Sequence, residues 1–202
     1  MRDHERAAEQ SGYRCVAGVD EAGRGPLAGP VVAAAVVLPG EVSLPGLRDS
    51  KKMSPTLRVK LFDQIIGECL GFGIGRVDEN TIDEINILQA ALLAMKRAVE
   101  QLTVPPDLLL IDGNRGIDCE MRQKTIVGGD DASLCIAAAS VLAKVTRDRL
   151  MEDYHEQYPQ YEFSRHKGYG TRLHRERIRQ YGPCPIHRKT FKGVAEFVKP
   201  RS

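Results

Sequence analysis

The sequence has no apolar run long enough to cross a membrane, since a transmembrane helix needs about 20 mainly apolar residues. The N-terminal residues, Met1–Arg6, lack the apolar core of a signal peptide. The five cysteines are scattered and never spaced as Cys-x-x-Cys, a distribution that argues against a zinc site and against a disulfide framework. We therefore expect a cytoplasmic protein with reduced thiols and no membrane association.

The charge of the chain is divided unevenly, although its net value is only +2. Residues 140–202 carry 14 lysines and arginines against 7 acidic residues, whereas the preceding residues have a net charge of −5. A basic C-terminal region beside an acidic part suits an enzyme that holds a polyanion with one and cations with the other. A basic, merely solvated surface explains the same count equally well.

Patterns typical of strands and helices alternate along the 202 residues, and the 42% of hydrophobic residues are enough for a sizeable core. Ser54-Pro55 has the residues of a helix start, Thr81–Glu84 has capping-box spacing, and alternating glycines in Leu70–Val77 allow close packing on a strand. We predict strands over 14–20, 31–38, 70–77, 108–111 and 122–127, and helices over 54–69, after 81, and over 131–154.

This alternation predicts an α/β fold, a mixed central sheet flanked by helices, with a small helical C-terminal extension. We expect a flexible N-terminus over residues 1–12, a catalytic domain over 13–155, and a basic, substrate-contacting region over 156–202 packed on the same domain. So short an N-terminus leaves no room for an additional domain before the first strand.

Four acidic residues follow predicted strands. Asp20 and Glu21 close the apolar run from Cys15, Asp112 follows Leu108–Ile111, and Asp130 follows the fifth strand. Functional sites of open α/β sheets collect at the carboxyl ends of strands. Neighbouring strand residues face opposite sides, so Asp20 and Glu21 share a site only if the strand breaks there or a backbone carbonyl takes part. The glycines that follow make a break plausible.

Carboxylates are ligands of hard cations such as Mg²⁺ or Mn²⁺, with water and substrate phosphate completing the shell. Two such ions about 3.5–4 Å apart can activate water and stabilise the leaving oxygen of an in-line displacement. The glycine-rich segment Ala22–Pro30 can bring backbone amides close to an anion. The sequence therefore predicts a metal-dependent enzyme that acts on a phosphodiester.

Several long motifs together resemble ribonuclease HII, the type 2 ribonuclease H, and the likeness is strongest between about Tyr13 and Gln180. They are Asp20-Glu-Ala-Gly-Arg-Gly-Pro-Leu-Ala-Gly-Pro30, Asp49-Ser-Lys-Lys52, Ile111-Asp-Gly113, Gly129-Asp130, Ile136-Ala-Ala-Ala-Ser-Val-Leu-Ala-Lys-Val-Thr-Arg-Asp148 and His166-Lys-Gly-Tyr-Gly-Thr171. The resemblance implies an RNase H-like fold and cleavage of the RNA strand of RNA–DNA hybrids. It also implies incision 5′ of single ribonucleotides in duplex DNA, leaving a 3′-hydroxyl and a 5′-phosphate.

The resemblance assigns catalytic metal binding to the four acids, Asp20, Glu21, Asp112 and Asp130. It assigns recognition of the ribose 2′-hydroxyl to Gly23, Arg24, Gly25 and Tyr169, and places Lys51 near backbone phosphate. Physical chemistry supports the second assignment, because the 2′-hydroxyl is the group that distinguishes RNA from DNA. Many relatives carry a lysine where this chain has Gly128, so a role for that lysine is in doubt here, and we do not count Asp131 as catalytic.

Ser140, Lys144 and Arg147 share one helix face by their spacing. They either face the substrate and the acids or form a solvated stripe, and we include Ser140 and Lys144 among the expected substrate contacts. His166 is a candidate for proton transfer, although a lone histidine is more often structural. We expect a monomer, and nothing in the sequence supports a sliding clamp as partner.

Two other classes of function fit part of these observations. A resolvase or transposase-type nuclease of similar fold would explain the four acids but not the Gly-Arg-Gly and Lys-Gly-Tyr-Gly segments. A non-catalytic nucleic-acid-binding module would use the glycine loop, which lacks Walker spacing, but would not need four acids at strand ends.

Overall fold

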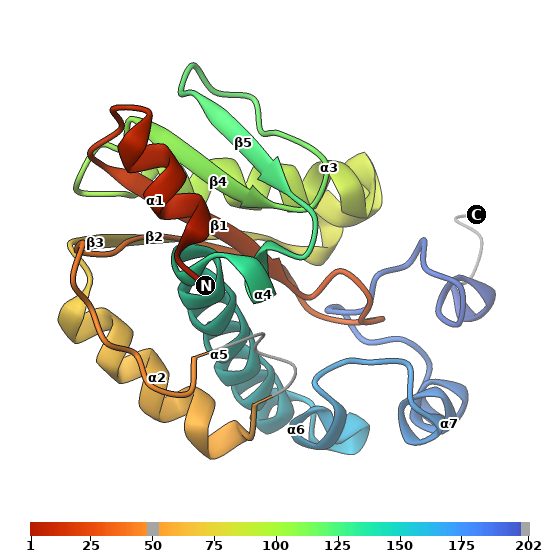
Figure 1. The fold of residues 1–202 in the computed structure, drawn as a ribbon. Helices are drawn as coiled ribbons and strands as arrows, with labels where there is room; N and C mark the ends of the chain where they lie inside the picture. Colours follow the sequence, from red (N-terminus) through yellow and green to blue (C-terminus); the bar gives the residue numbers. More distant parts are fainter. Residues whose placement is uncertain (48–52, 199–202) are drawn as a thin grey trace.

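A computed structural model describes residues 1–47 and 53–198 of the chain (Figure 1). Lys51, expected near phosphate, lies outside these residues. Within them, the strands form a five-stranded sheet in the order β3-β2-β1-β4-β5, consisting of β1 (Val16–Ala22), β2 (Val31–Val37), β3 (Gly71–Val77), β4 (Leu108–Asp112) and β5 (Gln123–Ile126). β1, β2 and β3 pair antiparallel, whereas β1, β4 and β5 pair parallel. The predicted mixed α/β sheet is confirmed.

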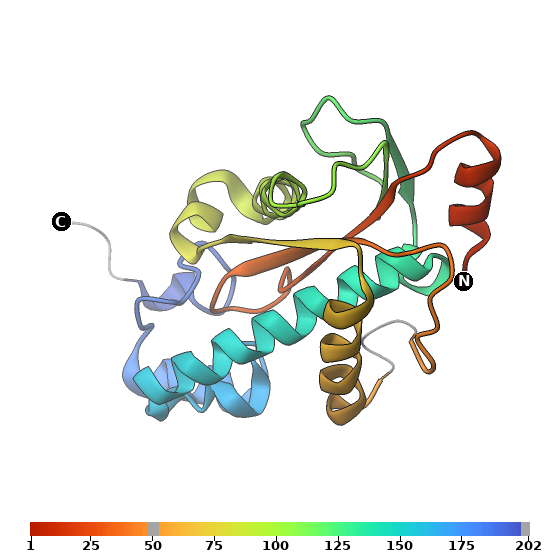
Figure 2. The ribbon, with the colours of Figure 1, turned by 90° about the vertical axis from the view of Figure 1, so that its left-hand side faces the viewer.

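Helices cover both faces of this sheet. α3 (Glu79–Glu100) lies on one face, and α5 (Leu134–Gln157) with α2 (Pro55–Glu68) lies on the other, as Figure 2 shows. Glycines allow this close packing, since a Cβ added at Gly75 would lie 2.0 Å from the carbonyl oxygen of Ala94, and one at Gly18 would lie 2.1 Å from the backbone of Cys135. The close approach expected from the glycines of the third strand is therefore confirmed.

Two predicted helix starts have different outcomes. Ser54 caps α2, and its side chain accepts a hydrogen bond from the amide of Leu57, as predicted. The capping box expected at Thr81 is wrong, because Asp78 caps the helix and accepts from the amide of Thr81 at 2.8 Å. α3 therefore begins one turn earlier, and it is kinked at Asn86, whose φ is 66°.

The helix predicted over residues 131–154 is two helices. α4 (Gly129–Ala132) ends at Ser133, which is extended (φ −122°), and α5 begins after it. The Ser133 side chain accepts a hydrogen bond from the amide of Ile136 and so caps the long helix. This break separates the turn that carries Asp130 from the helix that carries Ser140 and Lys144.

The N-terminal residues, expected to be flexible, instead form helix α1 (Asp3–Gln10). Its Glu5 is buried and accepts hydrogen bonds from the Ser133 hydroxyl at 2.7 Å and from the amide of Cys135 at 3.0 Å. A carboxylate at the N-terminus of α5 is also favoured by the helix dipole. Ala8 of the same helix packs on Leu108 and Leu110 of β4, and the expectation missed these contacts because the segment has few apolar residues.

The C-terminal part consists of short helices and loops, as predicted. Its helical segments are η2 (Pro159–Tyr161), α6 (Phe163–His166), α7 (Arg172–Tyr181) and η3 (Ala195–Phe197). Tyr161 and Phe163 pack with Met151 of α5 and with Ala28 from the loop after β1. This part therefore lies against the end of α5 and the β1–β2 loop (Figure 1). Within the described residues, no helix is both long and apolar enough to span a lipid bilayer.

Candidate active site

Asp20 and Glu21 lie within β1, not at a break in it. The strand stays paired with β2 as far as Ala22, which lies opposite Val32. Asp20 therefore faces α5, as Gly18 does, whereas Glu21 faces α3, as Val19 does. The expected strand break is wrong, and the alternative, a contribution from a backbone carbonyl, remains.

Asp112, at the end of β4, lies beside this pair. The parallel register places Val19 opposite Ile111, so Asp20 and Asp112 are the next residues along neighbouring strands. Asp112 faces α5 as its neighbour Leu110 does, and its Oδ1 accepts a hydrogen bond from the amide of Gly129 at 2.7 Å. That amide begins α4, which carries the buried Asp130. The structure therefore brings together Asp20, Asp112 and the turn of Asp130 on one side of the sheet.

The electrostatics of these acids indicate that their negative charge is only partly compensated within the protein. Burial, followed by the charges of Glu21 and Asp112, raises the pKa of Asp20 well above its usual range. Hydrogen bonds from Ser140 and from the amide of Glu21 partly oppose this shift. Burial also raises the pKa of Glu21, while Arg24, 3.2 Å from its carboxylate, opposes that shift. A cation near Asp20 and Asp112 would offset the cost of burying a negative charge and would reduce the repulsion between the carboxylates.

These acids do not form a closed cage. In the described part of the chain, no three histidine, cysteine or acidic side chains converge closely enough to hold an ion by themselves. Mg²⁺ is commonly held by one or two carboxylates, with water and substrate phosphate as the other ligands. The donor set at Asp20, Asp112 and Asp130 therefore fits a hard divalent cation whose remaining ligands come from outside the protein.

Two loops meet next to the acids. We call residues 23–29 the glycine loop and residues 166–171 the tyrosine loop. The amide of Leu27 donates to the carbonyl oxygen of Gly168 at 2.8 Å, and a Cβ added at Gly25 would lie 3.8 Å from the ring of Tyr169. Gly168 has φ +82°, and a Cβ there would lie 2.6 Å from the carbonyl oxygen of Ala28.

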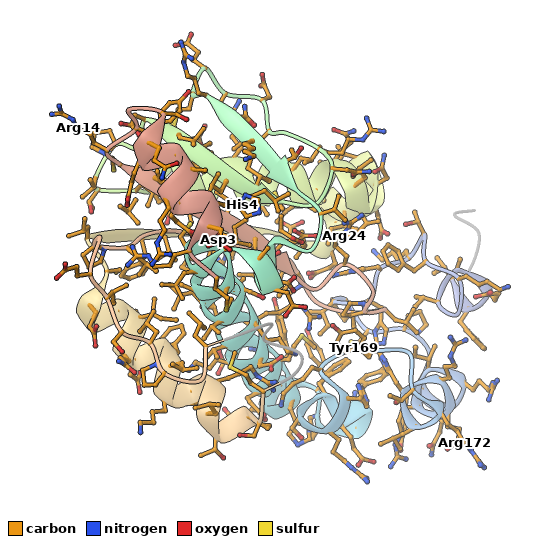
Figure 3. The ribbon with its side chains drawn as sticks, viewed as in Figure 1. Asp3, His4, Arg14, Arg24, Tyr169 and Arg172 are labelled. Carbon is orange, nitrogen blue, oxygen red and sulfur yellow. The ribbon has the colours of Figure 1, made fainter. Side chains whose placement is uncertain are left out.

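The Tyr169 side chain is 43% exposed, and Figure 3 shows it with Arg24 on the side where β1 leads into the glycine loop. The structure therefore brings together the residues predicted to recognise the ribose, Gly23, Arg24, Gly25 and Tyr169.

The helix face of Ser140, Lys144 and Arg147 does not act as one unit. Ser140 is buried and bonds to Asp20, whereas Lys144 pairs with Asp148 at 2.7 Å and lies 5.8 Å from the centre of the Tyr169 ring. Arg147 is fully buried and donates to the carbonyl oxygens of Ala28, Pro30 and Lys167. The interpretation as a solvated stripe is therefore wrong for Ser140 and Arg147.

His166 is buried away from the acids and has a structural role. Its Nε2 donates to the carbonyl oxygen of Tyr161 at 2.9 Å, and its Nδ1 accepts from the amide of Gly168 at 3.2 Å. Burial lowers the pKa of His166, so the ring is neutral near pH 7. Both ring nitrogens are engaged, which leaves neither for proton transfer.

Arg188 is a residue that sequence reasoning missed. It is fully buried, and its guanidinium donates to carbonyl oxygens of the glycine loop. In the sequence it is one of several C-terminal cations and looks like surface charge. No local pattern reveals it, because its partners lie about 160 residues earlier in the chain.

At position 128, where the resemblance predicts a lysine, this chain has a glycine with a left-handed backbone, φ 68°. Glycine adopts this conformation without strain, whereas other residues rarely do. A Cβ added there would meet no atom within 4 Å, so the reason for glycine is conformation and not crowding. Asp131 follows Asp130 in α4 and is exposed, whereas Asp130 is buried.

Comparisons with known proteins identify the family and the fold of this chain. The sequence model of the family described as ribonuclease HII matches residues 17–194. A ribonuclease HII from Geotalea uraniireducens is 57% identical over 199 residues, which cover 98% of this chain and 92% of that protein. The crystal structure of ribonuclease H2 from Pyrococcus horikoshii has a TM-score of 0.76 and 28% identity, covering 91% of this chain and 97% of that one.

The structure of Bst-RNase HIII in complex with Mn²⁺ shares the fold, with a TM-score of 0.68 and 19% identity over 94% of this chain and 71% of that one. The extent of the family match and the identity to the Geotalea protein leave one assignment: the chain belongs to the ribonuclease HII family and is an endoribonuclease.

Proposed function

We propose that this endonuclease cleaves the RNA strand of RNA–DNA hybrids and incises duplex DNA 5′ of single ribonucleotides, using two divalent cations. The products would carry a 3′-hydroxyl and a 5′-phosphate. The observation that carries the proposal is a juxtaposition: the buried Asp20 near the end of β1 and the half-buried Asp112 at the end of β4 lie next to the glycine loop and Tyr169. Chemistry and recognition of the sugar would then occur within a few residues of each other.

Asp20, Asp112 and Asp130 would hold the cations, and Glu21 would contribute its backbone carbonyl, because its side chain faces the other side of the sheet. Mn²⁺ is present in the structure of Bst-RNase HIII, and Mg²⁺ or Mn²⁺ both suit carboxylate ligands. When bound, such ions supply activation of water and stabilisation of the leaving oxygen. Ser140 holds the buried Asp20 in place by a hydrogen bond.

The glycine loop and Tyr169 would recognise the ribose. Tyr169 presents a ring that can stack on the neighbouring sugar and a hydroxyl that can form a hydrogen bond. Gly25, without a Cβ, leaves space beside that ring. Arg24 pairs with Glu21 and thereby links the recognition loop to the acids. An all-DNA duplex lacks the 2′-hydroxyl, so it would bind without being cleaved.

The basic C-terminal region, residues 156–202, would hold the phosphate backbone of the duplex. Several of its cations are exposed on α7, but Arg172 pairs with Glu176, and Arg177 pairs with Glu162. These ion pairs reduce the positive charge available for phosphate, so Arg172 and Arg177 would each contribute little to the affinity for the duplex. Lys144, half-buried beside Tyr169, is better placed to meet a phosphate near the ribose. Lys51 remains a predicted phosphate contact.

We also infer that the enzyme acts as a monomer in a reducing cytoplasm. The five cysteines, two of them buried, are all free thiols, which supports a reducing compartment.

The proposed function is tested with a labelled DNA duplex that contains one ribonucleotide, incubated with Mg²⁺ or Mn²⁺ and, separately, with EDTA. We expect one cut 5′ of the ribonucleotide with either metal and none with EDTA. All-DNA and all-RNA duplexes of the same sequence serve as controls and should remain intact. Cleavage in EDTA, or equal cleavage of the all-DNA duplex, would contradict the proposal.

A further inference from the structure

A short C-terminal segment, Cys184–Arg188, connects the glycine loop and the tyrosine loop. The amide of Gly29 donates to the carbonyl oxygen of Ile186 at 2.8 Å, and the amide of Arg188 donates to that of Leu27 at 2.9 Å. His187 and Ala28 form an antiparallel bridge between these two bonds. We call this segment the clasp. The clasp fixes the backbone of the glycine loop by this pairing, although about 160 residues separate the clasp and the loop in sequence.

The Arg188 side chain continues this attachment inside the glycine loop. Its guanidinium donates to the carbonyl oxygens of Gly23 at 2.6 Å, Arg24 at 3.0 Å, Pro26 at 2.9 Å and Gly29 at 2.8 Å. The five donors of a guanidinium have a rigid planar geometry, so they impose one arrangement on these carbonyl groups. A lysine would offer its donors from a single point and would not hold four carbonyl oxygens in the same arrangement.

The direction of these carbonyl groups determines the direction of the neighbouring amides. In a trans peptide the carbonyl and the following N–H point in opposite directions. Because the carbonyl groups of Gly23 and Arg24 point inward to Arg188, the N–H groups of Arg24 and Gly25 point outward. Among the hydrogen bonds of the described residues, none uses either of these two amides. Arg188 therefore directs these two N–H groups toward the surface that adjoins Tyr169, where no other described residue accepts from them.

The neighbouring residue, His187, reaches the tyrosine loop through a second histidine. Its Nε2 lies 3.0 Å from the Nε2 of His174, and the Nδ1 of His174 lies 3.0 Å from the carbonyl oxygen of Tyr169. The amide of Cys184 donates to the Nδ1 of His187 at 2.9 Å. All four residues are in the C-terminal part, and both histidine side chains are fully buried.

One arrangement of protons satisfies this chain of hydrogen bonds. The carbonyl oxygen of Tyr169 can only accept, so His174 carries its proton on Nδ1 and accepts on Nε2. His187 must then donate from Nε2 and accept on Nδ1, which matches the amide that points at it from Cys184. The chain is therefore directional, and it fixes the backbone of Tyr169 with both rings neutral.

We propose that His187 and Arg188 are positioning residues that set the distance between the glycine loop and Tyr169 and thereby determine the preference for single ribonucleotides over continuous hybrids. The inference rests on the proposed recognition of the ribose by these two loops. Arg188 orders the glycine loop, and the adjacent His187 orders the tyrosine loop through His174. An apolar residue at position 188 would leave the carbonyl oxygens of the glycine loop without these hydrogen bonds, so the role of Arg188 depends on its guanidinium.

The test compares kcat/KM on two substrates, a DNA duplex with one ribonucleotide and an RNA–DNA hybrid of the same length, with Mg²⁺. We expect Arg188→Lys to lower the ratio of single-ribonucleotide to hybrid cleavage by about tenfold or more, because a displacement of about 1 Å can cost up to 100-fold. The loss should be in kcat, with the dissociation constant for uncleavable all-DNA duplex changed by less than about twofold.

The control variant is Gln123→Ala. Gln123 is a half-buried side chain on β5 that makes hydrogen bonds with the amide and carbonyl of Ile117, far from both loops in sequence. Gln123→Ala should lower the melting temperature while leaving the ratio unchanged. If Arg188→Lys keeps the wild-type ratio, or if Gln123→Ala lowers the ratio equally, positioning by the clasp is contradicted.

Two further variants separate this inference from the proposed function. If Tyr169→Ala retains the wild-type ratio, the loops do not recognise the ribose, and it is the proposed function that fails. If Tyr169→Ala lowers the ratio, the double variant with Arg188→Lys should lower it no further, because both act through the same surface. Additive losses would contradict the inference. If Arg188→Lys does not fold, the same ratio is measured for His187→Gln, which acts on the tyrosine loop and should also lower it.

Discussion

The acids at the end of the sheet and the two loops beside them differ in how their polar groups are satisfied. Asp20 is buried and Glu21 is half-buried, and the pKa of both carboxyl groups is raised. In the loops, by contrast, carbonyl groups of residues 23–29 receive hydrogen bonds from Arg188, and that of Tyr169 receives one from His174. The charge of the acids is thus only partly compensated by the protein, whereas the loops are ordered by hydrogen bonds within it.

Under the proposed function, this difference means that the catalytic and the selective parts of the site are built on opposite principles. A surface that recognises one hydroxyl group must be rigid before the substrate arrives, because its discrimination depends on donor positions. A metal site can stay incomplete, since water and phosphate complete it. Substitutions in the two regions should therefore have different consequences.

The largest effect is expected at Asp130. Asp130→Asn should lower the rate of cleavage by about 1000-fold, because one carboxylate ligand of the reacting centre is lost. Binding of an RNA–DNA hybrid without metal should change by less than about threefold. Single-turnover cleavage and a binding titration measure the two effects. Asp131→Asn, one residue further along α4, is the control and should cleave at a wild-type rate. Undiminished cleavage by Asp130→Asn would remove this residue from the site.

The next largest effect is expected at Tyr169. Tyr169→Ala should lower the preference for a single ribonucleotide by about 10- to 100-fold, because stacking and a hydrogen bond at the junction are lost. Competition between a single-ribonucleotide duplex and a hybrid measures this preference. Tyr181→Ala is the control, since Tyr181 is a similarly exposed tyrosine on α7. Equal losses on both substrates would show that Tyr169 contributes affinity and not selectivity.

Lowering the pH should destabilise the folded protein through the buried histidines below the loops and stabilise it through the acids of the sheet. Burial lowers the pKa of His187 to about 4 and that of His174 to about 3, below the unfolded value of about 6.5. The unfolded state then binds more protons, so stability is fully present above about pH 6.5 and falls as the pH decreases toward 4. Each histidine accounts for about 1.4 kcal/mol per pH unit in that range.

Melting temperatures measured without metal between pH 7.5 and pH 5 test this dependence. His187→Gln should flatten the decrease by about 3 °C per pH unit. Asp20→Asn should make the decrease steeper. In the wild type, acid protonates the buried Asp20, whose pKa is raised, and this protonation stabilises the folded state; the variant lacks this contribution. If His187→Gln has the wild-type slope, His187 is not held neutral by its surroundings.

The smallest effect is expected for Asp20→Asn at neutral pH. The variant should raise the melting temperature of the metal-free enzyme by about 2–4 °C, since removing a buried charge near other acids gains about 1 kcal/mol. Glu120→Gln, an acid on the exposed loop before β5, is the control and should leave the melting temperature unchanged. A lower melting temperature for Asp20→Asn would show that the acids are already compensated within the protein.

Much of the site could be predicted because it depends on where strands end. Apolar runs such as Leu108–Ile111 locate strand ends well, and Asp112 follows one directly. The opposite directions of Asp20 and Glu21 also follow from strand alternation, but the glycines after them favoured a break. β1 in fact continues to Ala22 because β2 pairs with it along its length. Pairing between strands is a tertiary effect that local residue types do not reveal.

Other features depend entirely on distant partners. Glu5 positions α1 by contacts with Ser133 and Cys135, and Arg188 orders a loop that precedes it by about 160 residues. A buried charged side chain has the same local sequence context as an exposed one. Only the fold shows which of the C-terminal cations face inward, whereas composition alone made all of them look like surface charge.

The central claim, that the acids form an incomplete cation site beside a preorganised recognition surface, is tested most directly by thermal unfolding with Mn²⁺ and no nucleic acid. The account predicts that Mn²⁺ at ten times its dissociation constant raises the melting temperature of the wild type by about 3–5 °C, and that of Tyr169→Ala equally. Asp20→Asn should show less than half of this increase. An equal increase in Asp20→Asn, or a loss of the increase in Tyr169→Ala, would contradict the account.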